Sequence, residues 1–243
     1  MGLIRAFFMA LGMFTSIPSP YRPWDEEARN WMLVMLPIVG LVIGLMWAGF
    51  SWLGAKLLPG VAVALTVALP WLLTGFIHLD GYMDTCDAML SWRPLEKRLE
   101  ILKDSHTGAC AVVGLGLLIL FSHDAVRHGA NDCRPLIFIP LISRCGSAFS
   151  VLGLKPIGHS QYAGMRGNAV QRNAVIAMWL VGVIACALWL GRPALALLVE
   201  TAAYAIAMTW VYRTLHGVSG DVAGFALTVS ECAALVALTA LGG

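Results

Sequence analysis

The sequence predicts an all-α protein, a polytopic integral membrane helical bundle with about six to seven transmembrane helices. Of its 243 residues, 59% are hydrophobic and only 12% are charged, and the mean hydropathy is +0.78. Soluble domains carry roughly twice that share of charged residues. No linker rich in proline, glycine or serine divides the chain, so we expect one domain over residues 1–243.

The elements are expected in the following order. Residues 3–17 are apolar but too few to span a bilayer comfortably, which predicts a short N-terminal helix that is interfacial or re-entrant. Membrane spans then follow at residues 31–54, 60–79, 109–123, 135–153, 174–191, 194–212 and 222–241. Gly40, Gly44 and Gly49 in the first span would allow close helix packing. The interpretation that we prefer is the ordinary glycine content of membrane helices.

Positively charged residues are divided unequally between the loops. If residues 80–108 are cytoplasmic, then 1–30, 154–173 and 213–221 share their side, and these segments hold eleven lysines and arginines against four on the other side. The positive-inside rule therefore places them in the cytoplasm. The net charge of +2 is too small to indicate nucleic acid as a partner. Six cysteines stand singly, which is typical of buried thiols and not of disulfides or a zinc site.

The most polar part of the chain, residues 76–110, joins two apolar segments. Asp80, Asp84 and Asp87 share one face if the residues after His78 are helical. Bare carboxylates at this spacing destabilise a helix, and a divalent cation removes that cost. Mg²⁺ takes a few carboxylate oxygens and keeps its other positions for water and substrate phosphates.

A second pair of carboxylates, Glu100 and Asp104, is expected on one face of the next helix because the two are four residues apart. The alternative for both groups is a solvated acidic turn, its charges offset by the lysines and arginines of residues 93–103. We favour a metal–phosphate site, because the first group directly follows an apolar helix, where ionisable residues are usually functional. Small residues beside the charges, including Gly81 and Ser105, would let a phosphate approach the backbone.

Two charged residues lie inside apolar runs. Arg144 is either an interhelical or snorkelling arginine, or a partner for a phosphate or for the acidic group, and we slightly favour the functional role. Glu231 lies near the middle of the last span, where a carboxylate is functional by default, although it could simply pair with Arg144.

A glycine-rich segment, residues 216–224, immediately precedes the last span. Backbone N–H groups at such a helix start can hold an anion, so Ser219 and Asp221 are candidates for substrate binding. Plain helix capping is at least as good an explanation. His78 either positions a carboxylate or substrate, or is an ordinary histidine at a helix end.

Several motifs resemble those of the cobalamin synthase family, the adenosylcobinamide-GDP ribazoletransferases. Residues 78–87 (HLDGYMDTCD) resemble the family's HLDGxxDTxDG, and residues 99–108 (LEILKDSHTG) resemble LEIMKDSxxG. Residues 217–224 are similar to GxTGDxxG, and residues 14–20 and 37–44 are similar to FxTRIPxP and PxVGxxxG. The resemblance covers nearly the whole chain in order. The chain departs from the family pattern at Ser16 (usually Arg), Ala88 (Gly) and Ser219 (Thr). The first departure weakens a phosphate role for the N-terminal motif, and Ala88 indicates that the glycine serves packing.

The resemblance implies an enzyme that joins adenosylcobinamide-GDP and α-ribazole, or its 5′-phosphate, to give adenosylcobalamin or its phosphate and GMP. It further implies Mg²⁺ dependence, a place at the last assembly step of vitamin B12 biosynthesis, and a multi-pass protein of the bacterial inner membrane with its active site facing the cytoplasm. Membrane lipid surrounds such a protein, and the small packing residues permit a homodimer.

The residue roles that we expect from the resemblance fall into three groups. The metal ligands are Asp80, Asp84, Asp87 and Glu100. Asp104 is the base that takes the hydroxyl proton, and Asp84 is the other residue expected to be catalytic. The contacts to substrate or phosphate are His78, Lys103, Ser105, Arg144, Ser219 and Asp221.

Two other classes remain open. A phospholipid synthase like the CDP-alcohol phosphotransferases would use the same chemistry on a lipid, but the Ala-Arg pair of that family's signature does not follow Asp80-Gly81. A cation transporter would spread carboxylates through the spans, whereas most acidic residues here are expected at one membrane face.

Overall fold

The computed structural model describes residues 2–19, 21, 25–129, 132–158 and 167–241, and over these ranges the regular elements are all helices. In chain order they are α1 (Gly2–Phe14), α2 (Glu26–Leu57), α3 (Ala62–Leu73), α4 (Ile77–Leu90), α5 (Leu95–Ile101), α6 (Ala109–Gly129), η1 (Arg134–Ile137), α7 (Ile139–Gly153), α8 (Ala169–Leu190), α9 (Ala194–Leu215) and α10 (Gly220–Leu241). Six stretches are long and apolar enough to cross a membrane, namely α2, α6, η1 with α7, α8, α9 and α10. The predicted all-α membrane bundle is confirmed.

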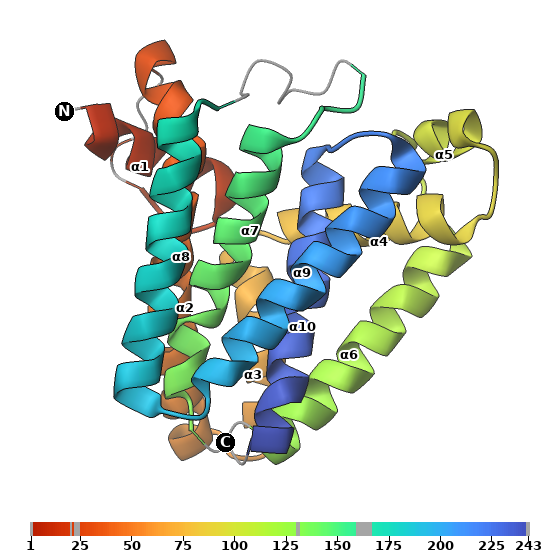
Figure 1. Cartoon of the computed structure of the whole chain (residues 1–243). Coiled ribbons are helices and arrows are strands. Elements are labelled where there is room, and N and C mark those ends of the chain that lie inside the picture. Colours follow the sequence, from red (N-terminus) through yellow and green to blue (C-terminus); the bar gives the residue numbers. More distant parts are fainter. Residues whose placement is uncertain (1, 20, 22–24, 130–131, 159–166, 242–243) are drawn as a thin grey trace.

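The short helices gather at one end of the bundle. In Figure 1, α1, α4 and α5 lie at the end where α2, α8 and α10 begin and where α7 and α9 finish. We call it the α4–α5 end. The described parts of the four positively charged segments, 1–30, 80–108, 154–173 and 213–221, all lie there (Figure 1). The expectation that they share one side of the membrane agrees with this arrangement.

The span expected at 60–79 is not one straight helix, because the chain turns sharply within it. Helices α3 and α4 meet at an angle of 92°. Gly75 and Phe76 at the break both have positive φ, 59° and 64°, a conformation that is unfavourable for a side chain as large as that of Phe76. Ser16 binds two carbonyls at the end of α3: its hydroxyl donates to Leu72 O at 2.6 Å, and its N–H donates to Leu73 O at 2.9 Å. The serine at the family's arginine position therefore stabilises this break.

The glycines of α2 divide into two kinds. A Cβ at Gly40 would overlap the carbonyl oxygen of Pro140, and a Cβ at Gly44 that of Ile137, so α2 and the segment from η1 into α7 pack backbone against backbone. Around Gly49, no described atom lies within 4 Å of such a Cβ. Our preferred interpretation is wrong for the first two glycines and holds for Gly49.

Candidate active site

Helix α4 carries the first carboxylate group in the expected way. Residues 77–90 are helical, so Asp80, Asp84 and Asp87 follow one another along a face at spacings of four and three. Asp84 is within electrostatic reach of both neighbours, and their negative charges repel its own. The predicted shared face is confirmed, and with it the like-charge repulsion that a cation would relieve.

The start of α10 brings a fourth carboxylate to this group. A Cβ at Gly81 would come within 2.6 Å of the Asp221 Cα, so the two helices cross with their backbones almost touching. Asp221 consequently lies within electrostatic reach of Asp80 and Asp84. The capping function goes to Ser219, whose Oγ accepts from the N–H of Val222 at 3.3 Å. The Ser219 hydroxyl also donates to Asp221 Oδ2 at 3.3 Å, so Ser219 holds the Asp221 carboxylate beside the group on α4.

Asp87 caps the helix that follows the loop. Its two carboxylate oxygens accept hydrogen bonds from Gly108 N at 2.6 Å and Ala111 N at 2.9 Å, at the start of α6. A Cβ at Gly108 would approach the Asp87 carboxylate to 2.7 Å, which explains a glycine there. Metal binding by Asp87 stays a prediction; the structure assigns it a structural task that links α4 to α6.

The second pair of carboxylates does not share a helix face, and that expectation is wrong. Helix α5 ends at Ile101, and Asp104 lies in the exposed loop beyond it. Glu100 is exposed and pairs with Lys97 at 2.6 Å. Asp104 accepts hydrogen bonds from the backbone N–H of His106 at 3.1 Å and from its ring at 2.6 Å. This local turn, in a stretch of Ser, Thr and Gly, competes with continuation of the helix.

The contact with His106 sets the acid–base character of the loop. Its hydrogen bonds lower the pKa of Asp104, and Asp104 raises the pKa of the His106 imidazole. A carboxylate with a lowered pKa holds a proton less readily, so His106 would have to leave before Asp104 could act as an efficient base. Ser105 is exposed in the same loop.

A cavity of about 440 Å³ lies at the α4–α5 end, between α1, α2, α4, α7 and α10. Four predicted substrate residues line it: His78, Lys103, Ser219 and Asp221. His78 is only 8% exposed, and its ring stacks on Phe14 with centroids 6.4 Å apart. Its Nε2 atom has no hydrogen-bond partner among the described residues. Segments that are far apart in sequence thus meet around one cavity.

The carboxylate oxygens gathered here are the type of ligand that Mg²⁺ prefers. Within the described residues, no three His, Cys, Asp or Glu side chains converge closely enough to bind a metal by themselves. Mg²⁺ is usually bound by one or two carboxylates together with substrate phosphates and water. Asp221, which lines the cavity, offers such hard oxygen ligands together with Asp80 and Asp84, which lie within electrostatic reach of it.

Arg144 lies away from this group. Its side chain is 1% exposed, and its guanidinium binds Glu231 directly, while the Ser143 hydroxyl donates to the same Glu231 oxygen at 2.9 Å. The alternative that Glu231 pairs with Arg144 is confirmed. Phosphate binding by Arg144 stays a prediction, and Arg144 is not among the residues that line the cavity.

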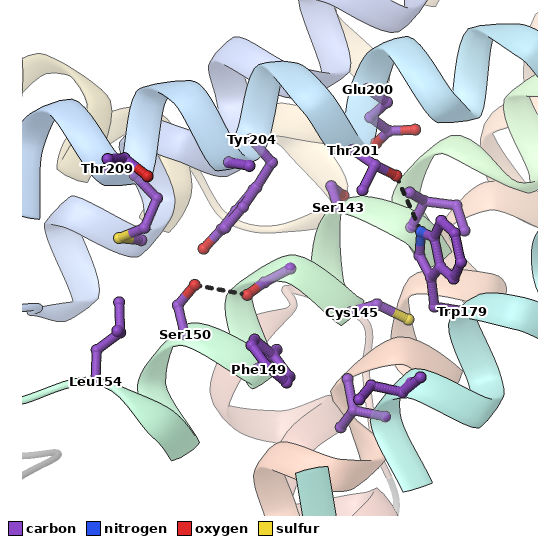
Figure 2. Close-up of a pocket in the computed structure, with 16 residues that line it drawn as sticks. Ser143, Cys145, Phe149, Ser150, Leu154, Trp179, Glu200, Thr201, Tyr204 and Thr209 are labelled. Carbon is purple, nitrogen blue, oxygen red and sulfur yellow. Dashed lines mark hydrogen bonds between the residues drawn. The ribbon is translucent and has the colours of Figure 1, made fainter. Parts of the chain in front are cut away.

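A second cavity, of about 420 Å³, lies between α7, α8 and α9 (Figure 2). None of the predicted site residues lines it. Glu200 and Tyr204 reach it from α9, and Trp179 donates from α8 to Thr201 Oγ1 at 2.9 Å (Figure 2). Glu200 is fully buried, and neither of its oxygens has a hydrogen-bond partner in the described part of the chain. Sequence reasoning missed Glu200, although the argument that singled out Glu231 applies to it equally.

Comparisons with known proteins agree on one family. The family model described as cobalamin-5-phosphate synthase matches residues 6–239. The adenosylcobinamide-GDP ribazoletransferase of Clostridium botulinum (strain Alaska E43 / Type E3) is 34% identical over 249 residues, covering 96% of each chain. Proteins of the same name from Geotalea daltonii and Geobacillus thermodenitrificans are 32% and 33% identical; the first covers 99% of both chains, the second 90% of this chain and 89% of its own. No solved structure matches.

Proposed function

This chain belongs to the cobalamin-5-phosphate synthase family, and we propose that it is a membrane-bound transferase that joins adenosylcobinamide-GDP to α-ribazole or its 5′-phosphate. The products would be adenosylcobalamin or its phosphate and GMP, formed in the last assembly step of cobalamin biosynthesis. The relatives named above for this activity align over 90% to 99% of this chain.

One observation carries the proposal: three motifs that are far apart in sequence meet at the α4–α5 end. His78 comes from α4, Lys103 from the loop after α5, and Ser219 and Asp221 from the start of α10, and all four line one cavity. Asp221 is within electrostatic reach of Asp80 and Asp84 on α4. Phosphoryl transfer requires positive charge that neutralises the phosphate oxygens. Carboxylates that can bind a cation, together with a lysine in the cavity, can provide it.

In the proposed reaction, a hydroxyl oxygen of ribazole forms a bond to the cobinamide-side phosphorus of the diphosphate, and the bond from that phosphorus to the bridging oxygen breaks. GMP leaves with that oxygen, and the hydroxyl proton passes to a base. Asp80 and Asp84, with Asp221, would hold Mg²⁺, whose bound charge neutralises diphosphate oxygens. Asp87 and Glu100 remain proposed ligands, and Lys103 and Ser105 proposed phosphate contacts.

Asp104 is the proposed base. It directly follows Lys103, which lines the cavity, but in this structure it binds His106. Asp104→Asn should abolish turnover and retain binding of the nucleotide substrate. An equal loss of nucleotide binding would instead make Asp104 a metal ligand.

The experiment that tests the function is turnover by the purified protein in detergent with adenosylcobinamide-GDP, α-ribazole and Mg²⁺. We expect GMP and the cobalamin spectrum to appear together, and both to be lost on addition of EDTA and restored by excess Mg²⁺. If neither ribazole form yields GMP from a preparation that binds Mg²⁺, the proposed activity is wrong.

We further propose that the protein resides in the bacterial inner membrane with its α4–α5 end in the cytoplasm. The excess of positive charge at that end supports this orientation. Reporter fusions at residue 105 and at residue 192, in the opposite loop, should respond as cytoplasmic and periplasmic respectively. The reverse result would contradict the orientation. A homodimer stays a prediction.

A further inference from the structure

The cavity at the α4–α5 end differs from a pure phosphate site in its walls. Besides the four polar residues named above, much of its lining is apolar and comes from α1, α2 and α7, including Phe14, Leu33, Leu36 and Val151. All four of these side chains are at most 5% exposed. Packed apolar walls with a few convergent polar groups are typical of a site for a small organic ligand.

Resting on the proposed function, we infer that this cavity is the binding site of the acceptor nucleoside, with the benzimidazole base against the apolar walls and the ribose toward His78, Lys103 and Ser219. The size of the cavity supports this assignment. At about 440 Å³ it falls within the ~300–1,000 Å³ of small-molecule sites, and a nucleoside fits such a volume. The corrinoid of the other substrate is several times larger and must remain outside.

The polarity of the walls discriminates against the guanosine of the donor. Guanine presents donors and acceptors along its edge, and burying them without partners would cost about 1–3 kcal/mol each. The base of ribazole consists of two fused aromatic rings with few polar atoms, so apolar walls favour it. Phe14, already stacked on His78, offers an aromatic surface.

The unpartnered Nε2 of His78 identifies the place of the ribose. A buried polar atom without a partner destabilises the protein unless a ligand or water binds it. His78 is only 8% exposed, and it lines the cavity. The Nε2 atom is itself covered in this structure, so the ring would have to turn toward the cavity for a ribose hydroxyl to supply the missing hydrogen bond. Asp221 lines the same cavity and is close to Asp80, so a hydroxyl held there is close to the carboxylates that would carry the diphosphate.

The test fills the cavity with a larger side chain. Leu36→Trp should raise the KM for α-ribazole at least about tenfold, equivalent to ~1.4 kcal/mol of binding, and leave the KM for adenosylcobinamide-GDP and inhibition by GMP unchanged. Leu45→Trp is the matched control on α2, because Leu45 is 52% exposed on the outer surface of the helix. Leu33→Phe is a milder filling if Leu36→Trp fails to fold, as judged by gel filtration.

Binding without turnover separates this inference from the proposed function. Calorimetry with α-ribazole alone should detect binding to the wild type and to Leu45→Trp, and weaker binding to Leu36→Trp. Ribazole binding by a wild type that releases no GMP, weakened in Leu36→Trp, would still support the site while refuting the activity. An unchanged ribazole affinity in folded Leu36→Trp and Leu33→Phe, or a rise in the KM for the donor alone, would overturn the inference.

Discussion

The two cavities that α7 lines are nearly equal in volume, about 440 and 420 Å³, yet different helices and loops form the rest of their walls. Ser147 and Val151 face the first, and Ser143, Gly146 and Ser150 face the second. Each contains a buried polar group without a partner among the described residues, His78 in the first and Glu200 in the second. Volume and unsatisfied polar atoms therefore do not distinguish them. What distinguishes the first is that residues from three separate motifs meet there.

The largest expected effect compares one carboxylate beside each cavity. Asp84→Asn should lower the rate of GMP release at least about 10²-fold, because an amide neither repels its neighbours nor binds Mg²⁺ as a carboxylate does. Glu200→Gln, the matched change at the second cavity, should stay within about twofold of wild type. Rates of GMP release from both variants, purified in parallel, measure this. Equal losses would mean that both cavities serve the reaction.

A second comparison concerns the buried ion pair of Arg144 and Glu231, neither of which lines either cavity. Arg144 is within electrostatic reach of His78 on one side and of Glu200 on the other. Arg144→Met leaves Glu231 buried without its partner and should destabilise the protein by about 3–5 kcal/mol. Adding Glu231→Leu should recover most of this loss. Denaturant unfolding in detergent measures both, and a double variant as unstable as the single one would contradict the structural role.

A third comparison sets a glycine at the site against one outside it. Gly81→Ala would place a Cβ within 2.6 Å of the Asp221 Cα, and the resulting separation of α4 from α10 should cost about 1–3 kcal/mol and reduce activity. Gly49→Ala meets no described atom within 4 Å and should be neutral or stabilising by about 0.5–1 kcal/mol. Thermal unfolding of the two variants checks this, and a Gly81→Ala protein as stable and active as wild type would refute the close crossing.

The smallest effect concerns the exposed loop beside the first cavity. Because Asp104 raises the pKa of His106, the pair's attraction is fully present below the ordinary histidine pKa and is lost as the pH rises through the raised value. Asp104→Asn should return the His106 pKa to its ordinary range. NMR titration of the His106 ring signals, assigned with His106→Gln, measures the shift. A His106 pKa that is the same with and without Asp104 would contradict the contact.

Sequence reasoning succeeded where the signal was local. The helical spacing of Asp80, Asp84 and Asp87 needs only a helix after His78, and the structure has one. It failed at Asp104, because a hydrogen-bonded turn with His106 ends the helix before that residue. It also failed at the break between α3 and α4, where Ser16 binds Leu72, a residue 56 positions later in the chain.

The sequence by itself determined that this is a helical membrane protein of one family, because hydropathy and ordered motifs are properties of the chain alone. Only the tertiary structure decided which polar residues share a site. Asp221 joins the carboxylates of α4 because Gly81 lets two backbones touch, and Arg144 turns to Glu231 because both are buried in the bundle. Such contacts depend on the approach of distant segments, and the spacing of residues along one helix carries no information about them.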